Sequence, residues 1–292
     1  MQSIQHHAQQ TWHNLPAVQT SFIGCEPAIA TIKELLQQTR LLTLTGSGGS
    51  GKTRLALSVA EDTLGDYPDG VAWVDLAPLA DPGLVPQTVA DALRLREQPQ
   101  RTYTDLLTEY LLDRRALLVL DNCEHLRAAC AELLTTLLQE GILARVLATS
   151  REPLAIEGEK VWLVPMLSVP TVNGNHAALP SRMAELMASE AVRLFEERAR
   201  AVVPSFTLSA QNAQAVAQIC QRLDGMPLAI ELAAARVNIL VPKQIAERLE
   251  DSVHLLTRGA HSSQSRHQTL RSALDWSFDL LPAKEQAFFT RL

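Results

Sequence analysis

Paired cysteines and long apolar runs are both missing from this sequence. The four cysteines form no C-x-x-C pair and have no histidine at zinc-ligand spacing, which indicates reduced thiols in a cytosolic protein. No apolar run approaches the roughly 18 to 20 residues of a membrane-spanning helix. Residues 1–20 also lack the apolar core of a signal peptide. We therefore expect a cytoplasmic protein without a membrane partner, and a flexible leader over residues 1–20.

An excess of positive charge is missing too. Lys and Arg number 26 against 32 Asp and Glu, so the formal net charge is −6. The chain then has no global positive field to attract nucleic acid, and any contact with DNA would need a local patch. Hydrophobic residues make up 47% of the 292, which predicts a folded protein that is long enough for two domains.

The first half of the chain alternates strand and helix patterns. Apolar strands are predicted at residues 41–45, 71–76, 116–121, 143–150 and 161–164. Helical spacing of apolar residues falls between them, at residues 26–40, 54–64, 85–95, 104–112 and 125–139. This alternation predicts an α/β domain over residues 21–166, with a mainly parallel sheet covered by helices on both faces.

The pattern changes after Pro165. Residues 168–180 are rich in Pro, Asn, Gly and small residues and mark a boundary. No later segment has a strand pattern, so an all-helical domain is expected over residues 181–257; its helices are predicted at residues 183–201, 209–223, 227–240 and 242–249. Two further helical segments, 269–280 and 283–292, run to the last residue, so we expect the chain to end within a domain.

A glycine-rich loop joins the first predicted strand to the next helix. It matches G-x-x-x-x-G-K-[ST], in which backbone N–H groups wrap phosphates at the positive end of a helix. The loop consists of Gly46, Ser47, Gly48, Gly49, Ser50, Gly51, Lys52 and Thr53. Lys52 is predicted to bridge the β- and γ-phosphates and Thr53 to bind Mg²⁺, and Arg54 is grouped with the nucleotide-binding residues. The sequence therefore predicts a site for ATP or ADP with Mg²⁺.

The strand that ends at residue 121 supplies a carboxylate. Residues 117–120 are apolar and deliver Asp121, which fits the Walker B role of fixing the metal. An acid commonly follows that aspartate, but here the next residue is Asn122, so Glu124 is the nearest candidate to orient the attacking water. Glu124 could equally be a helix N-terminal acid that interacts favourably with the helix dipole.

The strand that ends at Ser150 supplies a guanidinium. Arg151 follows this strand, at the edge where ligands of open α/β sheets bind, and could sense the γ-phosphate. A surface pairing of Arg151 with Glu152 or Glu157 is the alternative.

A glycine and a proline punctuate the helical half. Residues 224–229 read D-G-M-P-L-A, which is typical of a connection where one helix ends and another begins, with Pro227 in the first turn.

Five motifs taken together resemble one family, the NB-ARC-like branch of the STAND ATPases. They are residues 21–24, 46–53, 118–125, 149–154 and 223–233. The sequence is most similar to the ATPase modules of large bacterial transcriptional regulators of the AfsR and LuxR types. The likeness covers nearly everything from Leu15 to Leu292, and the motifs occur in the family's order.

This resemblance implies roles for several residues. Lys52 and Thr53 would be phosphate and Mg²⁺ ligands, Asp121 the Walker B acid and Arg151 the sensor arginine. Pro227, followed by Leu228, would pack against adenine. The early motif Phe22-Ile23-Gly24 would help to hold the base, although this chain has Cys25 where the family usually has arginine.

The resemblance also bears on partners. Residues 266–277 resemble the start of the family's winged-helix domain, so residues 266–292 are expected to be an incomplete one. No helix-turn-helix that would read DNA is recognisable, so DNA is expected as a partner only through modules not present in this chain.

Two functions stay open at this point. One is a slow ATPase switch, in which ADP holds the nucleotide-binding and helical units closed, and ATP opens them and promotes self-association. The other is a nucleotide-binding scaffold or regulatory module without useful hydrolysis, which the departures at Cys25 and Asn122 favour. A regulator that binds DNA by itself has the weakest support.

Overall fold

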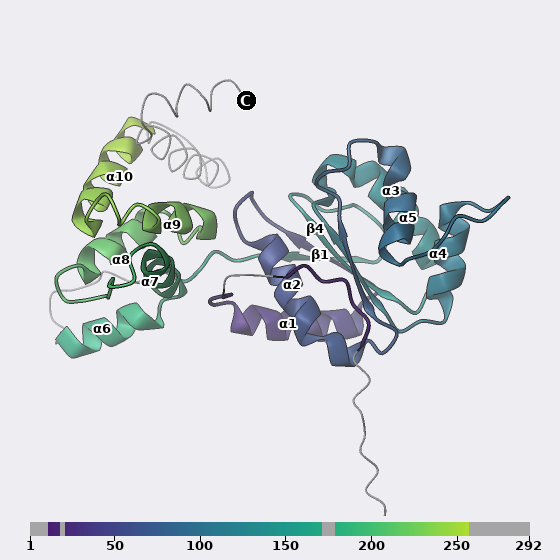
Figure 1. The fold of residues 1–292 in the computed structure, drawn as a ribbon, viewed down its shortest axis with the longest axis horizontal. Helices are drawn as coiled ribbons and strands as arrows, with labels where there is room; N and C mark the ends of the chain where they lie inside the picture. The colour runs from purple at the N-terminus through teal and green to yellow at the C-terminus, as the bar shows by residue number, and fades with distance from the viewer. Residues whose placement is uncertain (1–10, 18–20, 171–178, 257–292) are drawn as a thin grey trace, which may run out of the picture. The chain divides into compact units, whose positions relative to one another are not determined.

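The structure is a computed structural model that describes residues 11–17, 21–170 and 179–256 (Figure 1). It divides into two compact units. The first comprises residues up to 22, 26–46 and 52–164, and the second comprises residues 23–25, 47–51 and those from Pro165 onward. Each unit is described by itself below.

A five-stranded sheet in the order β2-β3-β4-β1-β5 forms the centre of the first unit. Every pairing between these strands is parallel, which confirms the parallel sheet predicted from the sequence. The strands are β1 (Leu41–Thr45), β2 (Val71–Asp75), β3 (Leu117–Asp121), β4 (Arg145–Ser150) and β5 (Glu159–Leu163). Because β4 lies between β1 and β3, the carboxyl ends of these three strands meet at one edge, where ligands of such sheets bind.

Helices cover both faces of this sheet, as Figure 1 shows. α1 (Glu26–Gln38) and α2 (Lys52–Asp62) pack together, and so do α3 (Val85–Ala92), α4 (Tyr103–Leu112) and α5 (Arg127–Gln139). β1 and β3 are buried along their whole length, which explains their continuous apolar sequences. Three short 3₁₀ helices complete the unit: η1 (Leu64–Asp66), η2 (Pro82–Leu84) and η3 (Cys123–Leu126).

Residues 11–17, which belong to the leader predicted over residues 1–20, run along the outer edge of β2. The Trp73 N–H donates to Asn14 Oδ1 (2.6 Å), and Asn14 Nδ2 donates to the Trp73 carbonyl (2.9 Å). The Val71 N–H donates to the Trp12 carbonyl (3.0 Å). The amide of Asn14 therefore acts like one more residue of a neighbouring strand. Residues 1–10 and 18–20 of the predicted leader lie outside the described residues.

We expect Asn14→Ala to destabilise the protein by about 1 kcal/mol, because the N–H and carbonyl of Trp73 would lose their partners. This should lower the thermal midpoint by about 2–4 °C. His13→Ala is the matched control, since the exposed His13 side chain neighbours Asn14 on the same segment. Thermal unfolding followed by circular dichroism measures both variants, and equal midpoints for the two would contradict the prediction.

Among its described residues from Pro165 onward, the second unit has helices and connecting segments but no strand, as the sequence predicted. Its helices are α6 (Leu179–Ala188), α7 (Glu190–Val202), α8 (Ala213–Arg222), α9 (Pro227–Ala234) and α10 (Pro242–Leu256). Their main core is an apolar cluster around Phe195, which is fully buried, and a smaller cluster consists of Leu186, Ala213 and Ala217. The winged-helix start that the sequence predicts over residues 266–292 lies outside the described residues.

One predicted helix, residues 183–201, is divided in two. The break is at Ser189, whose backbone is extended and whose hydroxyl donates to the Ser168 carbonyl (2.7 Å). The Glu190 N–H donates to the Ser168 hydroxyl (3.0 Å). A segment distant in the sequence thus satisfies the backbone at the start of α7, which local periodicity cannot predict. None of the described helices combines the length and the apolar sequence that a membrane span requires.

Candidate nucleotide-binding site

The glycine-rich loop lies where the sequence predicted it, between the end of β1 and the start of α2. Gly49 and Gly51 have φ values of +79° and +90°, which favour glycine. A Cβ at Gly49 would lie 3.0 Å from Leu228 Cβ, and the Leu228 N–H donates to the Gly49 carbonyl (3.3 Å). The tip of the loop, residues 47–51, therefore belongs to the same compact unit as the first turn of α9.

Lys52 is the first residue of α2, and its side chain is buried. Its ammonium donates to the carbonyl of Gly46 at the other end of the loop (2.9 Å). Burial lowers the pKa of Lys52, while the carboxylates of Glu124 and Asp121 oppose this shift and Arg151 adds to it. A buried cation at the base of a loop of backbone N–H groups is suited to an anionic ligand such as a phosphate.

Asp121 lies at the end of β3, and its exposed fraction is only 2%. Its Oδ1 accepts hydrogen bonds from the hydroxyls of Thr53 (2.9 Å) and Thr149 (2.5 Å), and its Oδ2 accepts one from Asn122 Nδ2 (3.0 Å). Burial raises the pKa of Asp121, although the bonds from Thr149 and Thr53 oppose the shift. The sequence did not predict Thr149 as a site residue. Thr149 lies on β4 and reaches Asp121 only because β4 pairs with β3.

The oxygen atoms of Thr53 and Asp121 fit a Mg²⁺ ion. Both are hard donors, and the two side chains are already within hydrogen-bonding distance of each other. Within the described ranges, no group of three or more His, Cys, Asp and Glu residues could enclose a metal. Mg²⁺ suits such a sparse site, because it commonly takes one or two protein oxygens and completes its shell with phosphate and water.

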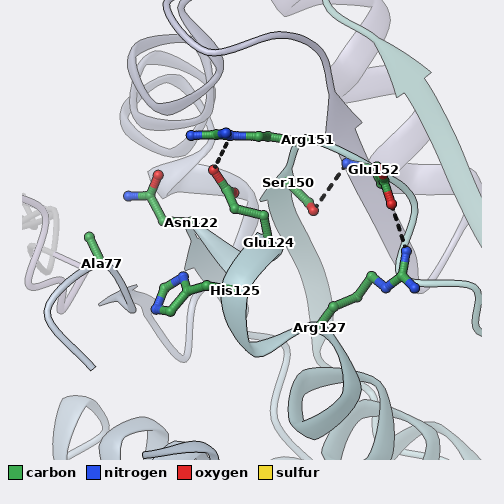
Figure 2. Close-up of a pocket in the computed structure, with 8 residues that line it drawn as sticks. All are labelled: Ala77, Asn122, Glu124, His125, Arg127, Ser150, Arg151 and Glu152. Atoms are coloured by element: carbon green, nitrogen blue, oxygen red, sulfur yellow. Dashed lines mark hydrogen bonds and ion pairs between the residues drawn. The ribbon is translucent and has the colours of Figure 1, made fainter. Parts of the chain in front are cut away.

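The two other predicted catalytic residues, Glu124 and Arg151, contact each other. Arg151 Nε donates to Glu124 Oε1 (3.1 Å), and Figure 2 shows the two side chains pointing toward one another. Glu152, one of the alternative partners of Arg151, instead pairs with Arg127 (2.9 Å). The other oxygen of Glu124, Oε2, is buried and has no hydrogen-bond partner among the described residues.

These two ion pairs lie in a cavity of about 530 Å³ in the first unit (Figure 2). Both connect η3 and the start of α5 with the segment after β4. Asn122, in the left-handed conformation (φ +63°), turns the chain from β3 into η3, and its N–H donates to the Thr149 hydroxyl (2.9 Å). The cavity is lined by Ala77, Asn122, Glu124, His125, Arg127, Ser150, Arg151 and Glu152.

The early motif lies next to the helix that follows the loop. Arg54 Nη2 donates to the Ser21 carbonyl (2.9 Å), and its guanidinium lies 6.0 Å from the centre of the Phe22 ring. Arg54, two residues after Lys52, thus contacts the early motif. Ile23 and Gly24, by contrast, group with the second unit, together with Pro227 and Leu228.

Residues 26–154 match the family model described as NB-ARC domain. The chain contains an NB-ARC domain. NB-ARC domains bind nucleotide, so this chain carries a nucleotide-binding module. The roles of the individual residues stay predictions.

The NB-ARC module has longer relatives. The chain is 46% identical over 261 residues to a Mycobacterium tuberculosis protein provisionally named an HTH-type transcriptional regulator, covering 89% of this chain and 27% of that protein. It is 38% identical over 273 residues to an uncharacterized Mycobacterium bovis protein, covering 94% of this chain and 65% of that one. The chain thus spans about a quarter of the length of the first relative. Its module is related to proteins named as transcriptional regulators.

A solved structure with a similar fold is that of Drosophila ORC bound to DNA. One chain of it matches this chain with a TM-score of 0.53 and 13% sequence identity, covering 92% of this chain and 85% of that one. At this identity the likeness concerns the fold alone. It supports the arrangement of a parallel α/β sheet followed by helices.

Proposed function

We propose that this chain is the nucleotide-responsive switch module of a transcriptional regulator, and that it binds ATP or ADP with Mg²⁺ and hydrolyses ATP slowly. The observation that carries the proposal is the arrangement of Lys52, Thr53 and Asp121 around the glycine-rich loop. The buried ammonium of Lys52 is suited to a phosphate. The buried carboxylate of Asp121, which accepts a hydrogen bond from the Thr53 hydroxyl, is suited to the metal ion that accompanies the phosphate.

Binding would use the backbone as much as the side chains. The N–H groups of the loop and the Lys52 ammonium would hold the β- and γ-phosphates, at the positive end of α2. Thr53 and Asp121 would hold Mg²⁺, which neutralises phosphate charge when it is bound. The raised pKa of Asp121 supports this assignment, because its burial leaves the carboxylate short of solvation that a cation can replace.

The adenine would lie against the first turn of α9. Pro227 Cγ would be 3.8 Å from a Cβ at Gly51, and Leu228 touches Gly49, so both residues lie directly beside the loop tip. Their apolar surfaces suit the face of a purine base. The early motif Phe22-Ile23-Gly24 is the second candidate contact for the base.

Hydrolysis would depend on Glu124 and Arg151. Glu124 is the acid nearest to Asp121 along the chain and is proposed to orient the attacking water. In the structure the Oε1 atom of Glu124 accepts a hydrogen bond from Arg151, so the proposed base and the proposed sensor are paired with each other. An ATP γ-phosphate would compete for the guanidinium, and this competition is consistent with a low turnover.

A second candidate function is nucleotide binding without useful hydrolysis. It is favoured by Asn122, which stands directly after Asp121 and is bonded to it, and by the ion pair that engages Glu124. In either case we propose that the nucleotide state controls self-association, and that contact with DNA involves parts of a longer regulator.

Phosphate release separates the two candidates. If the protein is a slow ATPase, Glu124→Gln should reduce phosphate release by about 100-fold, which is the usual contribution of a general base. Its affinity for ADP should stay within about twofold of the wild type, because Glu124 lies outside the loop. The rate is measured with a coupled phosphate sensor under single-turnover conditions.

Glu152→Gln is the matched control, because Glu152 lines the same cavity but pairs with Arg127. It should release phosphate at the wild-type rate. Equal rates for wild type and Glu124→Gln, both above that of Lys52→Ala, would show that Glu124 is not the base. If no protein exceeds Lys52→Ala, the ATPase assignment fails and the binding module stands.

A further inference from the structure

An unusual backbone conformation occurs just before α1. Gly24 and Cys25 both have left-handed φ values, +76° and +68°. Consecutive left-handed residues are uncommon, and at a non-glycine residue this conformation costs free energy unless the surroundings stabilise it. Gly24 is also buried, although it is only two residues from the exposed Glu26. These two residues belong to the second unit, so a group of that unit is expected to stabilise their conformation.

The stabilising group is the carboxylate of Glu190, at the start of α7. The Cys25 N–H donates to Glu190 Oε1 (2.7 Å), and the Ser168 N–H donates to Glu190 Oε2 (2.9 Å). One side chain therefore ties together three segments that are far apart in the sequence. Burial alone would raise the pKa of Glu190, but the hydrogen bonds from Cys25 and Ser168 outweigh it and hold this pKa below its ordinary value.

The fit between Gly24 and Glu190 leaves no spare room. A Cβ built on Gly24 would lie 2.9 Å from each of Glu190 Cγ, Cδ and Oε1. The backbone at residues 24 and 25 and the Glu190 side chain thus determine each other's positions. Cys25 also packs against the apolar cluster of the second unit.

Two contacts tie the start of this strap, residues 21–25, to the residue that directly follows the glycine-rich loop. Arg54, which directly follows Thr53, holds Ser21 and Phe22. Residues 23–25 lie in one compact unit with the loop tip. The base of a nucleotide that has its phosphates at the loop must lie beyond the loop, on the far side of the ribose, and a purine edge is commonly recognised by backbone groups.

We propose that Glu190 is a positioning residue for the nucleotide base: through the Cys25 N–H it fixes the strap in the conformation that receives the adenine edge. The proposal rests on the proposed nucleotide-binding function and adds a residue to it. The carboxylate of Glu190 accepts its hydrogen bonds from Cys25 and Ser168, so its effect should be confined to the base half of the ligand.

Two ligands test this. Mg·ADP carries a base, and Mg·tripolyphosphate carries phosphates alone. For Glu190→Gln, calorimetry should show an ADP affinity that is about tenfold weaker, the effect expected when one charge-assisted hydrogen bond is lost. Tripolyphosphate affinity should be unchanged. Glutamine keeps the size of the side chain but can accept only one of the two N–H bonds, so the loss reports on the carboxylate.

The matched control is Glu197→Gln, which removes a carboxylate from the same helix. Glu197 pairs with Arg198 (2.9 Å), and Arg198 keeps a second partner in Glu231 (2.8 Å). It should bind both ligands like the wild type. If wild type binds tripolyphosphate and ADP equally well, the base contributes nothing and the proposal fails while phosphate binding stands. If wild type binds neither ligand, the proposed function itself fails.

The thiol of Cys25 provides a readout that does not depend on binding. Cys25 is partly exposed, whereas Cys123, Cys130 and Cys220 are buried, so a maleimide should label Cys25 first in the folded protein. Labelling should be faster in Glu190→Gln than in wild type, and saturating ADP should slow it in wild type more than tripolyphosphate does. Equal labelling rates in wild type and Glu190→Gln, or equal protection by the two ligands, would overturn the proposal.

Gly24→Ala completes the test, because its Cβ would meet the Glu190 carboxylate. Its ADP affinity should fall in the wild-type background and fall less in the Glu190→Ala background, where the space is open. The two substitutions should therefore be non-additive. Additive losses would show that Gly24 acts through its left-handed backbone alone and that Glu190 does not position the strap.

Discussion

Lys52→Ala is expected to weaken the binding of both ATP and ADP strongly. The ammonium is buried at the base of the loop, so its loss removes a charge-assisted contact worth about 3 kcal/mol, which corresponds to about 100-fold in affinity. Calorimetric titration with Mg·ADP measures the loss directly. A thermal shift is the second measurement, because ligand present at about 100 times its Kd should stabilise the wild type by about 2.7 kcal/mol and the variant hardly at all.

The matched control is Lys33→Ala. Lys33 lies on α1 and pairs with Asp62 at the surface (2.6 Å). The substitution therefore removes the same charge from the same unit but leaves the loop unchanged. The unliganded Lys52→Ala protein should melt close to the wild-type temperature, since burial already disfavours the charged form of this lysine. An ADP affinity within about threefold of the wild type would contradict the role given to Lys52.

Gly225→Ala is expected to cause the largest loss of stability. Gly225 has φ +68°, and a Cβ there would clash with the carbonyl oxygen of Leu167. That oxygen belongs to the backbone, so no side-chain rotation can relieve the clash. The hydrogen bond from the Leu167 N–H to the Gly225 carbonyl (3.1 Å) also holds the two segments together. Strain at a left-handed residue and overpacking each cost about 1–3 kcal/mol, so about 4 kcal/mol should be lost.

Urea denaturation measures this loss, and Gly141→Ala is the control. Gly141 has a comparable left-handed φ of +79°, but a Cβ there would meet nothing within 4 Å. It should cost only about 1 kcal/mol, from the backbone conformation alone. Equal losses at the two positions would mean that the segment around Leu167 moves aside and does not constrain the turn before α9.

Much of the fold could be predicted because its signals are local. Continuous apolar strands that alternate with helical periodicity determine a parallel sheet, and the spacing of Gly46, Gly51 and Lys52 determines the loop between β1 and α2. Asp121 was found for the same reason, since it ends an apolar strand. The matched family model supports the identification of this half of the chain.

The contacts that complete the site could not be predicted, because they join distant segments. Thr149 reaches Asp121 only through the pairing of β3 with β4, and Glu190 reaches Cys25 across 165 positions in the sequence. Arg151 was expected to contact phosphate or a neighbouring acid, whereas the structure pairs it with Glu124. None of these contacts leaves a periodic pattern, and each depends on tertiary packing.

The amide of Asn14 also affects how this protein behaves beside other copies of itself. β2 is an outer strand of the sheet, and a bare outer strand offers unpaired N–H and C=O groups to which a strand of another molecule can add. Asn14 occupies both backbone groups of Trp73, and Trp12 accepts from Val71. Residues 11–17, which form no regular strand, thus cover the outer edge of β2 and oppose strand-to-strand aggregation there.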